Sequence, residues 1–234
     1  MANPVVSAAV ALGLIYDQLG VALNAYGVFD DNASGLPRWQ QAALVNWLAD
    51  ADLEVQRACA ESPGSSYRNY FVNPTPAQLD NGDPLPATSI GPPQAVWIEN
   101  QALVARIGQP APTTWMNYFN EDDDNVFGGA AFTDRLYSVI DNRVYFCGAQ
   151  ADVYYCQIAR ATVPALPALP TLASPEAFTN TLVKAVIGWA ASKEGDYPQV
   201  AQGFLVQYDN DLMSIRQGAT EVPPVQQVQK QVAA

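Results

Sequence analysis

Proline is concentrated in two stretches of this chain, and these stretches limit where a helix or a central strand can form. The first covers residues 73–93, and the second is the run VPALPALPTLA, residues 163–173. Proline has no backbone N–H and a fixed φ, so it interrupts helices and is confined to the edges of sheets. We therefore predict an extended surface loop over 73–93 and a proline-spaced linker over 163–173.

Hydrophobic residues recur at helical spacing in two segments that precede the first of these stretches. The first pattern stops at Gly27, and the second ends at Pro63-Gly64. A spacing of three or four residues places apolar side chains on one face of a helix, and glycine or proline often follows a helix end. The sequence predicts two antiparallel helices, over about residues 7–26 and 38–61.

Two more helices are predicted after the linker. A serine directly before a proline, and later an aspartate two residues before a proline, supply the N-cap signals. The expected helices cover about residues 175–194 and 197–217. The last residues, 219–234, contain scattered valines but no face that a helix could bury, so we expect an extended C-terminal arm.

The region from about 67 to 162 is rich in residues that favour strands. The stretch AVWIENQALVARIG predicts a hairpin that turns at Glu99-Asn100-Gln101. Three further strands, at about 135–140, 143–147 and 153–160, are expected to form a β-meander. Asp141-Asn142 suits the tight turn between the first two of them, because both residues tolerate positive φ.

These elements together predict an α+β fold. We expect a helical bundle, formed by the N- and C-terminal helix pairs, that packs with a central antiparallel β-meander. The bundle and the meander are expected to form a single domain over residues 1–218, from which the extended loop and the C-terminal arm project.

The composition excludes several kinds of chemistry. Histidine is absent, so Ser-His and Cys-His nucleophiles are excluded, and only carboxylate pairs such as Glu99 with Asp134 are left for an acidic hydrolase. Of the three cysteines, Cys147 and Cys156 could face each other across a hairpin as a disulfide or as half of a metal site. Zinc needs about four ligands and free cysteine is usually buried, so we favour two core side chains. We expect no cofactor, no metal and no enzyme activity.

Acidic residues outnumber basic ones, 23 against 11, which gives a net charge of −12. Such a chain is not expected to bind the phosphate backbone of a nucleic acid. The acidic run EDDDN lacks the glycine and the closing glutamate of a calcium loop, so we expect a solvated loop.

No apolar run reaches the roughly 20 residues of a membrane span, and no membrane partner is expected. The apolar opening VVSAAVALGLIY follows no basic residue, unlike a signal peptide, and the few cysteines fit the cytosol.

Aromatic residues next to the acidic run leave two interpretations open. Trp115, Tyr118 and Phe119 would suit a carbohydrate-stacking platform, and they would equally suit a sheet core or a subunit interface. We favour the interface, because an aromatic sheet face without a partner is typical of an assembly surface.

The order of elements resembles that of the head-to-tail adaptor (connector) proteins of tailed bacteriophages. The segments that carry the resemblance are RWQQAALVNWLADADLEVQRA, AVWIENQALVARIG, DRLYSVIDNRVYFCGAQADVYYCQIARATVPALPALP and SPEAFTNTLVKAVIGWAASKEGDYPQVAQGFLVQYDNDLMSIRQ. In that family the C-terminal helix pair packs back on the N-terminal helices. The resemblance is one of layout and covers nearly the whole chain.

The resemblance implies a structural role in the virion neck, after assembly in the host cytoplasm. About twelve copies would form a ring beneath the portal, extend the DNA channel and hold the tail or nozzle. Double-stranded DNA would pass without specific binding, along an acidic lining for which the candidates are Glu121, Asp122, Asp123 and Asp124. Family members dock on the portal through an extended C-terminal segment. The matching arm here contains Val222, Val225, Gln226, Gln227 and Val228.

Two features depart from the family's pattern. The proline-rich loop over 73–93 is long, and the N-terminal helix lacks the usual charged residues. Another neck or tail structural protein therefore stays open as an alternative, beside a carbohydrate-binding β-module.

Overall fold

The computed structural model describes residues 4–19, 40–62, 67–72, 82–98, 102–103, 105–106, 136–147, 153–194 and 198–223. The fold is a mixture of helices and small sheets, which agrees with the α+β class expected from the sequence. The chain divides into two compact units. The helical unit consists of residues 3–67 and 160–234, and the β unit of residues 68–159. A single domain over 1–218 stays a prediction.

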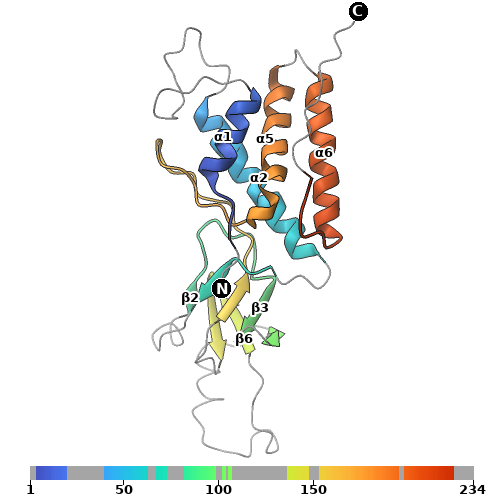
Figure 1. Cartoon of the computed structure of the whole chain (residues 1–234). Coiled ribbons are helices and arrows are strands. Elements are labelled where there is room, and N and C mark those ends of the chain that lie inside the picture. Colours follow the sequence, from blue (N-terminus) through green and yellow to red (C-terminus); the bar gives the residue numbers. More distant parts are fainter. Residues whose placement is uncertain are drawn as a thin grey trace, which may run out of the picture. The chain divides into compact units, whose positions relative to one another are not determined.

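The helical unit contains helices from both ends of the chain (Figure 1). Its elements are α1 (Ala8–Leu19), α2 (Gln41–Glu61), the 3-10 turn η1 (Glu176–Phe178), α5 (Thr179–Glu194) and α6 (Pro198–Arg216). Helix α5 contacts α1, α2 and α6, and α2 also contacts α6. Helices α2, α5 and α6 begin within a few residues of the starts predicted near 38, 175 and 197, whereas residues 20–26 of the first predicted helix lie outside the described residues.

Helix α5 is buried over most of its circumference, as a helix with neighbours on several sides must be. Its buried side chains include Leu182, Val183, Val186 and Ile187. A Cβ added at Gly188 would come within 2.8 Å of Cδ2 of Leu205, so this glycine lets α5 and α6 approach closely. A charged side chain on a buried face of α5, such as that of Lys184, therefore needs a partner inside the unit.

The segment before α1 is tied to the segment that leads into α5. Val6 N–H donates to Ser174 O, and Glu176 N–H donates to Pro4 O, both at 2.9 Å. Residue Val5 forms an isolated antiparallel bridge with Pro175. These bonds join residues more than 160 positions apart in sequence.

Two small sheets make up the described part of the β unit. One sheet has the order β1-β8-β3-β4, and its strands are Tyr70–Val72, Val153–Cys156, Ala95–Ile98 and Ala102–Leu103. The other has the order β2-β7-β6-β5, with strands Asp83–Pro84, Arg143–Cys147, Leu136–Ile140 and Ala105–Arg106. Among the described strands, all pairings are antiparallel except that of β5 with β6, which is parallel.

Both predicted hairpins are present. Strands β3 and β4 pair around the Glu99–Gln101 position, with Ile98 opposite Ala102. Strands β6 and β7 pair across Asp141 and Asn142, whose φ values are 47° and 60°. Positive φ at both central residues is the geometry of the favoured two-residue hairpin turn, which explains why this dipeptide predicted it correctly.

The third strand of the expected meander belongs to a different sheet from the first two, so the predicted three-stranded meander is wrong. Strand β8 pairs with β1 and β3 in the first sheet and not with β7 in the second. The residue pattern identifies a strand but not its neighbour, and both neighbours of β8 lie more than 50 residues away in sequence. Within the predicted loop 73–93, Asp83–Pro84 forms the short strand β2 on a sheet edge, where proline is tolerated.

The β unit has a small core that both sheets supply. It consists of Leu85, Val96, Tyr137, Val144, Val153 and Tyr155. The ring of Tyr70 stacks on that of Tyr155, with 5.4 Å between centroids. The Tyr155 hydroxyl donates to Asp83 Oδ2 at 2.9 Å, which satisfies a carboxylate that is only 8% exposed.

Among the helices that the structure describes, none is long and apolar enough to cross a membrane.

Candidate functional site

Most of the site residues proposed from the sequence lie outside the described part of the chain. Of the arm residues Val222, Val225, Gln226, Gln227 and Val228, the structure describes only Val222, which is partly buried. The acidic residues 121–124 are outside the described ranges, as are Trp115, Tyr118 and Phe119. Within the described residues, the candidate site is therefore the place where the arm begins.

The arm begins with a reversal of the chain at the end of α6. Gly218 has φ +96°, and the N–H groups of Gly218 and Ala219 donate to Ile215 O and Ser214 O at 2.9 and 3.0 Å. A glycine in the left-handed region with bonds of this kind is a common helix C-cap. The following residues, 219–223, which we call the arm root, run back alongside α5 and α6 (Figure 1).

A buried ion pair between α5 and α6 meets the end of the arm root. Lys184 Nζ donates to Asp211 Oδ2 at 2.7 Å and to Pro223 O at 2.9 Å. The Thr181 hydroxyl donates to the same Asp211 oxygen at 3.2 Å. The side chains of Lys184 and Asp211 are only 2% and 6% exposed. Buried charges of this kind are tolerated when paired and hydrogen-bonded, as here.

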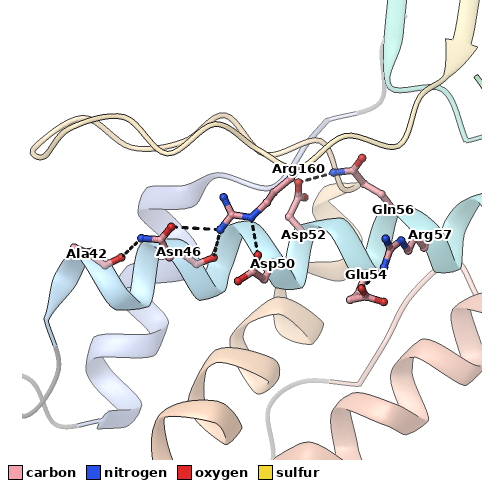
Figure 2. Close-up of polar contacts among 8 residues, drawn as sticks. All are labelled: Ala42, Asn46, Asp50, Asp52, Glu54, Gln56, Arg57 and Arg160. Carbon is pink, nitrogen blue, oxygen red and sulfur yellow. Dashed lines mark hydrogen bonds and ion pairs between the residues drawn. The ribbon is translucent and has the colours of Figure 1, made fainter. Parts of the chain in front are cut away.

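A second buried carboxylate holds the end of the proline-rich linker. Asp52 on α2 is fully buried, and its carboxylate accepts hydrogen bonds from Ser174 N at 2.9 Å and from Ala173 N at 3.2 Å. Gln56 Nε2 donates to Asp52 Oδ2 at 2.7 Å (Figure 2). Burial raises the pKa of Asp52 above its ordinary value, although these hydrogen bonds act in the opposite direction.

The beginning of the linker is held on the same helix. Arg160 Nε donates to Asp50 Oδ1 at 2.6 Å (Figure 2). Arg160 Nη2 donates to the backbone oxygen and to the side-chain Oδ1 of Asn46, both at 3.3 Å. Between its two anchors the linker runs out and back as a narrow loop (Figure 2). Its turn is closed by Ala168 N–H, which donates to Ala165 O at 3.2 Å, and Leu166 in this turn is 43% exposed. The linker is thus an anchored loop with an apolar, exposed turn.

The metal site and the cysteine pair considered from the sequence can be compared with the described residues. No cluster of three or more Cys, Asp or Glu side chains that could hold a metal occurs among them. Cys147 and Cys156 do not face each other across a hairpin, because Cys147 is paired with Leu136 in one sheet and Cys156 with Ala95 in the other. Cys156 is free and buried, and burial raises the pKa of its thiol to about 12, so it is a poor nucleophile near neutral pH.

One aromatic cluster is visible in the β unit. The Arg68 guanidinium lies 4.8 Å from the ring centroid of Trp97 and 5.8 Å from that of Tyr154. Trp97 is only 9% exposed. The Arg68 guanidinium also covers a ring face that a sugar would need for stacking. This cluster is accordingly structural in character.

Sequence reasoning missed the buried charges on which the arm root and the linker depend. Lys184 was visible as a single charge within the apolar run TLVKAVIGWAA, which is a usable signal. Its partner Asp211 is 27 residues away, and no local pattern connects the two. Comparisons with known proteins supply no relative either: no family model matches this chain, and no curated protein matches it in sequence.

Proposed function

We propose that this protein is a structural virion protein that forms an oligomeric ring at the head-to-tail junction of a tailed bacteriophage. The ring, of about twelve copies, would join the portal to the tail or nozzle and extend the DNA channel. Assembly would take place in the host cytoplasm. The observation that carries the proposal is the way in which the two ends of the chain share one helical unit.

This layout supports the proposal because it has the features that the adaptor resemblance implies. Helix α5, from the C-terminal part of the chain, packs on α1 and α2 from the N-terminal part. The β unit, residues 68–159, is inserted between them in sequence. A proline-spaced linker then leads into α5, and an arm follows α6. Each of these elements stands in the order of the adaptor layout.

The C-terminal arm is the proposed portal-binding element. Its root is held on the helices, while the residues from 224 onward are polar with interspersed valines. Many weak arms around a ring would bind a symmetric partner with high avidity, which offsets the entropy lost when each arm becomes ordered.

Charge and surface composition fit the same role. A net charge of −12 would let DNA slide past, with the acidic residues 121–124 as a proposed channel lining. Several large apolar side chains of the helical unit are exposed in the single chain, among them Val10, Leu14, Val206 and Met213 at 57, 39, 50 and 56%. Neighbouring copies in a ring would cover surfaces of this kind.

Electron microscopy tests the proposal most directly. The purified protein is mixed with the portal ring of the same virus, and the complexes are imaged with the portal alone as a control. We expect an additional ring on one end of the portal. A chain that remains monomeric and never joins the portal would overturn the adaptor assignment. Density elsewhere in the tail of native particles would instead identify another neck or tail component.

A further inference from the structure

We propose that Lys184 and Asp211, together with the Pro223 carbonyl, form a polar latch that holds the arm root on the helical unit and can open without unfolding the helices. The proposal deepens the function proposed above, because it says where a portal-binding arm becomes free. Its evidence is the set of contacts around the Lys184 ammonium, and its test requires no portal.

The ammonium is shared between the helices and the arm. Lys184 Nζ lies 2.7 Å from Asp211 Oδ2 on α6 and 2.9 Å from Pro223 O at the end of the arm root. A carbonyl that follows a helix end and meets a buried cation makes a charge-assisted bond, which is stronger than a bond between neutral groups. The arm root is therefore held at both ends, by the Gly218 turn and by the ammonium.

The two contacts of the ammonium differ in burial, and this difference allows the latch to open. The Lys184–Asp211 bond is buried, whereas the Lys184–Pro223 bond is only partly buried. When Pro223 leaves, Asp211 still pairs with Lys184 and still accepts from the Thr181 hydroxyl. Water can take the place of the carbonyl, so opening leaves no buried charge unpaired. Local opening of this kind requires much less free energy than unfolding of the helices.

The latch divides the arm into two parts with different roles. Residues 219–223 set the point and direction from which the arm leaves, and a partner would bind the sequence that follows Pro223. A fixed exit point reduces the disorder that binding must remove, which favours binding. Val222, partly buried in the arm root, belongs to the latch in this division and not to the partner-binding part.

The first experiment uses limited proteolysis of the full chain by a protease that cleaves after glutamate. In the wild type, the bond after Glu221 should be cleaved at least about tenfold more slowly than the same bond in an unstructured peptide, because a protease needs a detached stretch of chain. The double variant Lys184→Met with Asp211→Leu removes both charges together and keeps apolar packing. In this variant the bond after Glu221 should be cleaved at the rate of the unstructured peptide, while far-UV circular dichroism shows that the helices are retained.

Two outcomes of this experiment would overturn the proposal. One is an unprotected arm root in the wild type, and the other is unchanged protection of the arm root in the double variant. The control is Lys193→Met on the same helix, a lysine that is exposed and lies over Trp47. This variant should leave the arm root protected.

A second experiment keeps the ion pair and changes the arm, in case the double variant does not fold. Residues 220–223 are replaced by Gly-Ser-Gly-Ser in the full chain, and a matched control carries the same replacement at 226–229. Acylation of lysines by acetic anhydride is then followed by mass spectrometry. Lys184 should react at least about fivefold faster in the first variant only, since the arm root no longer covers it, and Lys193 should react equally in all. Equal Lys184 rates in both variants would overturn the latch.

These tests separate the latch from the proposed function. A protected arm root in a protein that never binds a portal would leave the latch standing and remove the adaptor role. Portal binding by a protein whose arm root is unprotected would do the reverse.

Discussion

The helical unit and the β unit bury polar groups in different ways. In the helical unit three charged residues, Asp52, Lys184 and Asp211, are buried. Asp52 and Lys184 bond to backbone groups outside the four long helices, and Asp211 pairs with Lys184. In the described part of the β unit, Asp83 is buried against the hydroxyl of a core tyrosine, between strands of two to five residues.

The way in which each unit satisfies its backbone groups explains the role of its buried charges. The α-helices satisfy their own backbone groups, so their buried charges are free to hold other segments, namely the linker and the arm root. The β unit depends on long-range strand pairs, and its polar contact joins an edge strand, β2, to the core.

The largest effect on stability is expected for Lys184→Met. The variant leaves the Asp211 carboxylate buried without its cation, which should lower the free energy of unfolding by about 3–5 kcal/mol. The double variant with Asp211→Leu should recover most of this loss, because it leaves no buried charge. Urea unfolding followed by far-UV circular dichroism measures both. Equal losses in the single and double variants would contradict the role assigned to the pair.

An intermediate effect is expected for Tyr155→Phe in the β unit. The variant removes the hydroxyl that donates to Asp83 and keeps the ring that stacks on Tyr70, so the β unit should lose about 1–3 kcal/mol. Hydrogen exchange should be faster in strands β6, β7 and β8 and unchanged in α5. Faster exchange in both units alike would mean that they do not unfold separately.

The local elements of the structure could be predicted from the sequence, whereas the contacts between distant segments could not. Helix positions and the Asp141-Asn142 turn were predictable, because caps, apolar spacing and positive-φ residues are local signals. The pairing of β8 was not, since its two neighbours, β1 and β3, are more than 50 residues away in sequence. The reversal after Gly218 was visible only as a helix end. Its continuation to Lys184 depends on a tertiary contact.

The pH dependence of stability should distinguish Asp52 from an ordinary surface carboxylate. Burial raises the pKa of Asp52 in the folded protein, so the folded state binds this proton more tightly than the unfolded state does. The stability of the wild type relative to Asp52→Asn should therefore increase as the pH falls from 7 through the raised folded pKa. The increase is complete below the unfolded pKa and is lost as the pH rises again.

Thermal unfolding of the wild type and Asp52→Asn between pH 7 and about pH 3 measures this difference. Other carboxylates titrate in both proteins, so their contributions cancel. The size of the change reports the pKa shift directly, at about 1.4 kcal/mol per unit. Parallel stability curves would show that Asp52 has an ordinary pKa. Asp50→Asn is the matched control, because Asp50 is on the same helix and its side chain is 48% exposed.

The smallest effect is expected at the turn of the linker. Leu166 is 43% exposed between anchors at Arg160 and Ser174, so Leu166→Ala should change the free energy of unfolding by no more than about 0.5 kcal/mol. Leu172, in the same linker but 2% exposed, is the matched control, and Leu172→Ala should lose about 2–5 kcal/mol. Both are measured by urea unfolding. Since the anchors and not the turn fix the linker, a large loss for Leu166→Ala would mean that its side chain is buried by a second copy of the chain, and the loss would then depend on protein concentration.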